Sequence, residues 1–138
     1  MASAYGYRDL EVWQLSMQMV EWVFGLTPLL PDHQRFGLIS QMQRAAVSVP
    51  SNIAEGHAKR SSKDYPRHLR IAAGSIAELE TQLELCVRLR FLSREQIRET
   101  WSLLQRVAQM LARLIQRVAA REKHDPPPTP NPERRTPS

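Results

Sequence analysis

The stretch RAAVSVPSNIAEGHAKRSSKD, residues 44–64, contains the signals for the end of one helix and the start of the next. Small and apolar residues repeat at helical spacing around Pro50, and Gly56 is a typical helix-ending residue. Ser61 and Asp64 have the spacing of a capping box, which satisfies the free backbone N–H groups of a first helical turn. The stretch therefore predicts two helices joined by a short basic turn.

Outward from this stretch, apolar residues at steps of three and four predict four helices. We expect the first after Asp9 as its N-cap, the second over about 34–57, the third from Ser61 or Ser62, and the fourth from Ser93. The expected core stripes are Leu10, Trp13, Met17, Val20 and Phe24; Ile39, Met42, Ala46, Val49 and Ile53; Leu69, Ala72, Ile76, Leu79, Leu83 and Cys86; and Ile97, Trp101, Leu104, Ala108, Leu111, Ile115 and Val118.

These helices predict an all-α fold, an antiparallel up-down four-helix bundle, because short connections force neighbouring helices to reverse direction. We assign residues 1–124 to the bundle and residues 125–138, with six prolines in fourteen residues, to a disordered tail. The fourth helix carries a second apolar stripe, which favours a subunit interface. The alternative is a helix deeply buried within one chain. The second stripe consists of Leu103, Val107, Met110 and Leu114.

Charge is distributed unevenly along the chain. Residues 1–57 carry three basic and five acidic side chains, and residues 58–123 carry fourteen and seven, giving net charges of −2 and +7. The chain as a whole has a net charge of +5. A positive field in the second half of the folded part permits a polyanionic partner.

The single cysteine and the hydropathy of the chain argue against disulfide bonds, membrane spans and export. Cys86 has no partner for an internal disulfide and lies among leucines, so we expect a small core residue. No run reaches the roughly 18 apolar residues of a membrane span, and the N-terminus lacks an export signal. We expect a cytoplasmic protein that does not enter membranes.

Basic residues cluster at the turn after the second helix and along the fourth helix. Arg and Lys in such rows contact phosphates without reading base sequence. The predicted nucleic-acid-binding residues are Lys59, Arg60, Lys63, Arg67, Arg70, Arg106, Arg113 and Arg117. No aromatic residues interleave these rows as stacking platforms, and no helix-turn-helix or zinc-knuckle motif is present. The alternative is a charged surface that only keeps the helices soluble.

Polar residues also line one side of the second helix and a flank of the third. We expect structural polar contacts between the two helices, with Arg44–Glu78 and Asn52–Glu55 as candidate pairs. A solvated helix face is the alternative. The predicted structural residues are Arg44, Asn52, Glu55, Ser75 and Glu78.

Catalytic chemistry is not expected. The sequence lacks a phosphate-binding glycine loop, a nucleophile elbow and the Glu-x-x-His pairs of di-iron bundles. His33, His57, His68 and His124 lie at helix ends or at exposed-looking positions, where we expect them to face solvent. We therefore predict no catalytic residue, no cofactor and no metal site.

The segments YRDLEVWQLSMQMV (7–20) and LISQMQRAAVSVPSNIAEGHAKRSSKDYPRHLRIAAGSIAELETQLEL (38–85) resemble a known family. They are similar to the four-helix-bundle proteins encoded in intervening sequences of bacterial 23S ribosomal RNA genes. The resemblance covers about residues 7–118, and its most specific part is 52–56, followed by 73–75 and 78–79.

The resemblance implies more than a fold. The family is similar in fold to the accessory protein of diversity-generating retroelements. Members of both groups form ring-like pentamers, and the retroelement accessory protein binds nucleic acid and a reverse transcriptase. For this chain it implies a homopentamer that scaffolds nucleic acid or an enzyme.

Two functions follow from the residues and the resemblance together. The first is a non-catalytic oligomeric scaffold that binds RNA or DNA electrostatically and serves as an accessory factor to a reverse transcriptase or another nucleic-acid enzyme. The second is a purely structural homo-oligomer whose partners are proteins only. Reversing the charge of Arg106, Arg113 and Arg117 should abolish polyanion binding in the first case and change nothing in the second.

Overall fold

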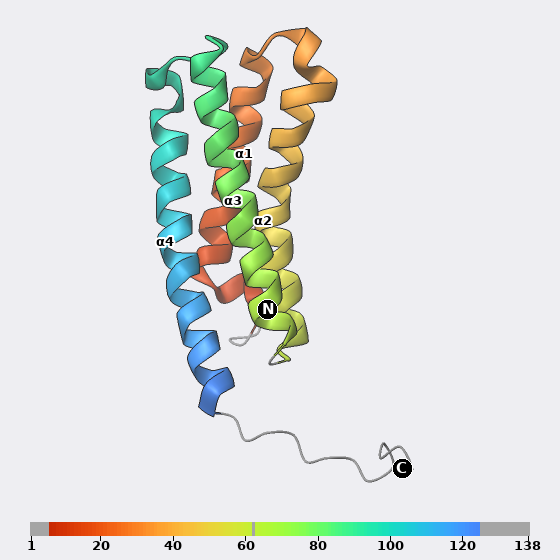
Figure 1. The fold of residues 1–138 in the computed structure, drawn as a ribbon, viewed down its shortest axis with the longest axis vertical. Helices are drawn as coiled ribbons and strands as arrows, with labels where there is room; N and C mark the ends of the chain where they lie inside the picture. The colour runs from red at the N-terminus through yellow and green to blue at the C-terminus, as the bar shows by residue number, and fades with distance from the viewer. Residues whose placement is uncertain (1–5, 62, 125–138) are drawn as a thin grey trace, which may run out of the picture.

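The structure is a computed structural model that describes residues 6–61 and 63–124, and this part contains helices and turns but no strand. Consecutive helices run in opposite directions and pack as one bundle (Figure 1). The prediction of an antiparallel four-helix bundle is confirmed, and the predicted tail at 125–138 lies outside the described residues. The four helices are α1 (Glu11–Leu26), α2 (Ser40–Lys59), α3 (Asp64–Arg88) and α4 (Arg94–His124).

The two ends of the bundle are assembled from different parts of the chain. The α2–α3 turn, the start of α1 and the end of α4 lie together at one end, and the α1–α2 and α3–α4 connections lie at the other (Figure 1). The last turns of α4 extend beyond the neighbouring helices. Residues of the turn after α2 are thereby brought to the same end of the molecule as the C-terminal half of α4.

The centre of the bundle follows the predicted stripes of α2 and α3, which form the most extensive helix pair. Every predicted stripe residue of α3 is at most 2% exposed, and Met42, Ala46, Val49 and Ile53 of α2 are fully buried. Ile39 is only partly buried because it belongs to an irregular turn before α2. The three-and-four spacing identified the inward faces of these two helices correctly.

The predicted face of α1 is wrong. The buried residues are Val12, Leu15, Met19, Val23 and Leu26, together with the small Ser16. Met17 and Phe24, which we expected in the core, are 40% and 41% exposed. Apolar residues occur on several sides of this helix, so more than one stripe has the required spacing.

The N-cap prediction for α1 is also wrong. Asp9 ends a short 3₁₀ helix, Tyr7–Asp9, and Leu10 precedes α1 without a side-chain cap. The backbone N–H of Leu10 donates to Tyr7 O, which continues the chain smoothly into α1. A short 3₁₀ turn therefore takes the place of a side-chain cap at this start.

Of the two predicted capping boxes, the one at Ser93 is formed, and the one at Ser61 makes only one of its two bonds, while α3 itself begins at Asp64 after Lys63. Ser61 Oγ accepts from the backbone N–H of Asp64 at 2.9 Å and caps α3, whose first turn contains Pro66. At the start of α4 the bonds are reciprocal, since Ser93 N donates to Gln96 Oε1 at 2.8 Å and Gln96 N donates to Ser93 Oγ at 3.1 Å. Both caps satisfy backbone N–H groups that have no partner inside their helix.

Gly56 does not end α2, contrary to the prediction. The helix continues through buried Pro50 and Gly56 to Lys59, and its C-cap is Arg60, which has a left-handed backbone with φ of 50°. The glycine is instead required by packing. A Cβ atom at Gly56 would lie 2.9 Å from the Cβ of His68, closer than real Cβ contacts.

The connection from α1 to α2 is more irregular than expected. It consists of two short 3₁₀ helices, Thr27–Leu29 and Asp32–Gln34, followed by a wide turn at Arg35–Ile39. Gly37 breaks the helical geometry there with φ and ψ both at −108°. The second helix was expected from about residue 34, but regular α-helix starts at Ser40.

The broad apolar surface of α4 is largely covered within one chain. Leu103, Val107 and Leu114 of its second stripe are at most 9% exposed, and Met110 packs partly against the core. Within the described residues, the alternative of a deeply buried helix therefore accounts for most of this surface. The second stripe alone does not require a subunit interface.

Candidate nucleic-acid interface

The helices on either side of the predicted basic turn pack closely against each other, forming the α2–α3 joint. Gly56 lets the first turn of α3 approach α2 closely, since a side chain there would meet His68 Cβ at 2.9 Å and Tyr65 Cδ1 at 3.2 Å. The His57 and Tyr65 rings meet edge to face with their centroids 5.7 Å apart. Beside this close packing, the basic side chains Arg60 and Lys63 are exposed.

A row of buried and half-buried polar groups crosses the same joint. Ser75 Oγ on α3 donates to Ser48 Oγ on α2 at 2.8 Å. One turn further, Asn52 Nδ2 donates to the Ser48 carbonyl at 2.8 Å and to its Oγ at 3.0 Å. Asn52 Oδ1 lies 2.9 Å from Nδ1 of His68. These contacts fix the axial register of α2 against α3.

The row ends at His68, which is 5% exposed, so the prediction of a solvent-facing histidine is wrong. Its Nε2 atom lies 3.3 Å from Lys59 Nζ, 3.5 Å from Arg67 Nη2 and 3.9 Å from Glu55 Oε1. The imidazole thus connects the buried row to the exposed charges of the turn. The sequence contained one sign that His68 is buried: it lies four residues before Ala72 and therefore on the same helix face as the core stripe.

The predicted structural residues are partly brought together, but the predicted pairs do not form. Arg44 donates to Ser40 Oγ at 3.3 Å, and no hydrogen bond or ion pair joins it to Glu78 in the part of the chain that the structure describes. Asn52 and Glu55 both face His68 instead of each other. Asn52 and Ser75 make the expected contacts between α2 and α3, whereas Arg44 and Glu78 are exposed, as the alternative of a solvated helix face expects.

The predicted phosphate-binding residues are all exposed, but only some of them form ion pairs with a nearby carboxylate. Lys59 pairs with Glu55 at 3.4 Å, and Arg67 pairs with Asp64 at 3.4 Å. Such exposed pairs contribute little stability and open readily. Five of the other predicted cations make no ion pair with a described carboxylate; these are Lys63, Arg70, Arg106, Arg113 and Arg117.

Basic residues from two separate segments converge on Tyr65. Burial raises the pKa of its hydroxyl, and the positive charges of Arg121, Arg60 and Arg117 oppose that shift. The α2–α3 turn and the end of α4 therefore act on one phenol group. We call this end of the bundle the basic end; its cations, from the α2–α3 turn, the first turn of α3 and the end of α4, are Lys59, Arg60, Lys63, Arg67, Arg117 and Arg121.

Two residues at the basic end were not predicted. Arg121 continues the α4 row one turn beyond Arg117, and its spacing of four was a usable signal. Tyr65 follows the basic turn directly in the sequence and was not among the predicted site residues. The ring is partly buried against the core.

Two of the predicted arginines of α4 line a cleft beside α1. Arg113 and Arg117 line a small cleft of about 110 Å³ beside the start of α1, together with Leu10 and Glu11. Arg70 and Arg106 lie exposed on the outer surfaces of α3 and α4. These positions extend the positive surface from the basic end along the bundle.

At the opposite end, the cations are neutralised by neighbouring carboxylates. Glu84 pairs with Arg88 at 3.3 Å and with Arg94 at 3.1 Å. Arg98 pairs with Glu95 one turn along α4. The Glu84 pairs lower the pKa of that carboxyl, chiefly through the hydrogen bond from Arg94. Arg88, Arg94 and Arg98 are thus paired with carboxylates at the end of the bundle opposite the basic end.

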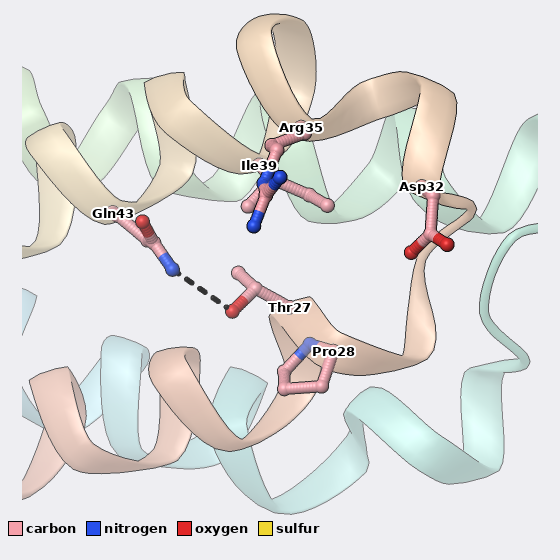
Figure 2. Close-up of a pocket in the computed structure, with 6 residues that line it drawn as sticks. All are labelled: Thr27, Pro28, Asp32, Arg35, Ile39 and Gln43. Atoms are coloured by element: carbon pink, nitrogen blue, oxygen red, sulfur yellow. Dashed lines mark hydrogen bonds between the residues drawn. The ribbon is translucent and has the colours of Figure 1, made fainter.

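A cleft at the α1–α2 connection offers little chemistry. It has a volume of about 330 Å³, and Gln43 Nε2 donates across it to Thr27 Oγ1 at 3.2 Å (Figure 2). Asp32 and Arg35 are its charged lining residues. No cluster of three His, Cys, Asp or Glu that could hold a metal ion occurs among the described residues. None of the described helices is both long and apolar enough to cross a membrane.

The basic end and the bundle can now be compared with known proteins. The family model described as 23S rRNA-intervening sequence protein matches residues 8–113. The chain belongs to this family. The match to the 23S rRNA-intervening sequence proteins spans α1, α2, α3 and most of α4, so the predicted resemblance is confirmed.

A solved structure shares the fold of this 23S rRNA-intervening sequence protein. It is the crystal structure of a protein of unknown function from the S23 ribosomal protein family of Bacteroides thetaiotaomicron, with a TM-score of 0.70 and 26% sequence identity. The similarity covers 76% of this chain and 98% of the other. A search of curated proteins finds no match. Neither the family description nor that of the solved structure names a catalytic activity.

Proposed function

We propose that the chain is a non-catalytic scaffold that binds nucleic acid electrostatically through the basic end. The observation that carries the proposal is that exposed basic residues from two distant segments, Arg60 after α2 and Arg117 and Arg121 near the end of α4, lie at the same end of the bundle (Figure 1). Converging guanidinium groups suit a phosphate backbone, because each can donate to phosphate oxygens without reading a base. RNA and DNA are both expected ligands.

The proposal predicts a strong dependence of affinity on salt. Each phosphate that the basic end neutralises releases counterions, so log K should fall linearly with log salt concentration, with a slope near −0.9 per contact on duplex DNA. Binding of labelled single-stranded and double-stranded RNA and DNA across a salt series measures this slope. A slope near zero, or no binding at low salt, would contradict the proposal.

Charge reversal locates the site. Arg117→Glu with Arg121→Glu removes two cations from the basic end, and we expect the slope to fall by about two contacts. The matched control is Arg94→Glu with Arg98→Glu, which makes the same change in net charge at the opposite end of α4. Equal loss in both variants would show that net charge, not the basic end, determines binding.

A second candidate function is self-assembly, favoured by the outward surface of α3. Ile71, Leu85 and Leu89 are 42%, 42% and 54% exposed there. Next to them a shallow groove of about 420 Å³ contains Gly74 and Gln82, whose buried Oε1 has no hydrogen-bond partner among the described atoms. Exposed apolar side chains beside an unsatisfied amide are typical of a surface that a protein covers.

The two candidates are compatible, and mass measurements separate them. If α3 packs on another copy, Ile71→Glu with Leu85→Glu should lower the mass seen by analytical ultracentrifugation, while R117E/R121E should not. The family resemblance sets the expected assembly at five copies. It also implies a reverse transcriptase partner, which a binding assay with the purified enzyme would test. Loss of nucleic-acid affinity in the α3 variant as well as in R117E/R121E would favour a ring that multiplies weak phosphate contacts.

A further inference from the structure

The small cleft between the start of α1 and the second half of α4 carries charges of both signs. Its volume is about 110 Å³, well below the roughly 300–1,000 Å³ of pockets that enclose a whole drug-sized ligand. It therefore suits one small group rather than a long segment of a ligand. Its charged lining residues are Glu11 from α1 and Arg113 and Arg117 from α4. Its apolar lining residues are Leu10, Val12, Met110 and Leu114.

The charged groups of the cleft are exposed and are not paired with each other. Within the described part of the chain, no ion pair or hydrogen bond joins Glu11 to Arg113 or Arg117. The two arginines are one turn apart on α4, about 6 Å along the helix axis, so their guanidinium groups can act side by side. Donors and acceptors of opposite charge are thus available to the same ligand.

A ligand that uses both charges must present donors on one edge and acceptors on another. A phosphate offers acceptors only, and the Glu11 carboxylate would repel it. Guanine offers N1–H beside its N2 amino group, which match the two oxygens of a carboxylate. It also offers O6 beside N7, which match a guanidinium group. Adenine, cytosine and uracil lack the two adjacent donors, so the charges of the cleft favour guanine.

We propose that this cleft binds one unpaired guanine base, with Glu11 accepting from N1 and N2 and with Arg113 or Arg117 donating to O6 and N7. The base must be unpaired, because in a duplex its N1 and N2 edge is occupied by cytosine. The proposal rests on the proposed function, since Arg117 also belongs to the basic end, which contacts the phosphates of the same strand. The scaffold then has a base preference in addition to its electrostatic affinity.

Short oligouridines with one central guanosine, adenosine or cytidine test the preference at constant salt. The guanosine oligomer should bind at least about fivefold more tightly than the other two, because a bidentate pair discriminates strongly between bases. Inosine lacks the N2 donor, and 7-deazaguanosine has a C–H group in place of N7. Each of these two analogues should lose most of the preference. Equal affinity for all of these oligomers would overturn the proposal and leave the electrostatic function standing.

Glu11→Gln separates base recognition from net charge. The variant loses one of the two acceptors and a negative charge, so the guanosine preference should disappear while the affinity for plain oligouridine should not fall. Glu21→Gln is the matched control, since it makes the same change in charge at an exposed position further along α1. It should retain the preference. Loss of the preference in both variants, or in neither, would overturn the role of Glu11.

A pair of arginine variants tests the other side of the cleft. Arg113→Gln should reduce the guanosine preference, because one of the two guanidinium groups that line the cleft is removed. Arg106→Gln changes an exposed arginine of α4 outside the cleft and should weaken all oligomers alike. An equal effect of the two variants on the preference would contradict the proposed contacts.

Guanosine itself tests the cleft without a polynucleotide. When it is added to the full chain, the methyl resonances of Val12, Met110 and Leu114 should shift, whereas adenosine should leave them unchanged. If the wild-type chain binds no RNA, the proposed function fails, and the guanosine titration still decides the cleft. Shifts confined to these methyl groups would support the guanine site, and unchanged resonances would overturn it.

Discussion

A Cβ atom on Gly56 of α2 would lie 2.9 Å from the Cβ of His68 on α3. The two helices therefore meet at a point where only glycine fits without movement of the backbone. The contact lies next to Arg60 and Tyr65, so close packing at this position is directly connected to the geometry of the basic end.

Gly56→Ala should destabilise the protein by about 1–3 kcal/mol, because the added methyl group overpacks the joint. Gly74 is the matched control, since a Cβ there meets nothing within 4 Å in the same helix pair. Gly74→Ala should stabilise by about 0.5–1 kcal/mol through helix propensity. Urea unfolding of both variants measures the difference, and equal effects would contradict this account of Gly56.

Glu84 should make the stability of the bundle sensitive to acid. Arg94 and Arg88 lower the pKa of its carboxyl, so its stabilising contribution is present above the ordinary value of 4.5 and is lost as the pH falls through the lowered value. Glu84→Gln should therefore lower the urea midpoint near neutral pH and have little effect at about pH 3. Glu99→Gln, at an exposed position on α4, should show no such dependence.

Cys86 should be inert while the protein is folded. Burial raises the pKa of its thiol to about 11, and its Sγ donates to Met42 Sδ at 3.8 Å inside the core. Since the thiolate is the reactive form, a disulfide reagent should modify the native chain only through unfolding. The modification rate should rise steeply across the urea transition. Rapid modification of the native chain at neutral pH would contradict the burial of this side chain.

Tyr65 should favour single-stranded ligands. Its ring is partly exposed at the basic end, where an aromatic face beside a positively charged surface can stack unpaired bases. Tyr65→Ala should weaken single-strand binding by about 1 kcal/mol or more and affect duplex binding less, while Tyr65→Phe should retain both.

Phe36 provides the control for the tyrosine prediction, because it is a 92% exposed aromatic residue before α2 at the other end of the bundle. Phe36→Ala should leave binding unchanged. An equal loss for single and double strands in Tyr65→Ala would indicate a packing defect rather than stacking.

Local patterns predicted α2 and α3 well because each has one apolar stripe with polar residues opposite. In α1, no charged residue occurs between Glu11 and Glu21, so the sequence does not distinguish the inward face from the outward one. The core packing of the other three helices selects Met19 and Val23 over Met17 and Phe24. Which apolar residues of α1 face inward is decided by its packing against the other helices, so the spacing of residues within α1 does not predict it.

The candidate site was predicted less completely, because much of it also depends on contacts between helices. The exposed cations could be identified from charge and helical spacing, and Arg121 would have followed from the same rule. The burial of His68 depends on Asn52 from another helix, and the convergence on Tyr65 depends on α4 ending beside the α2–α3 turn. Contacts between elements distant in sequence determine both features.

The left-handed backbone conformation of Arg60 lowers the stability of the folded protein. An L-residue with φ of 50° is disfavoured by about 1 kcal/mol relative to glycine, and Arg90 has the same conformation, with φ of 62°, after α3. Arg60→Gly and Arg90→Gly should both raise the melting temperature, but only Arg60→Gly should weaken nucleic-acid binding. At Arg60, the protein therefore has a less stable turn than glycine would give, but it has a guanidinium group at the position where the two basic segments meet.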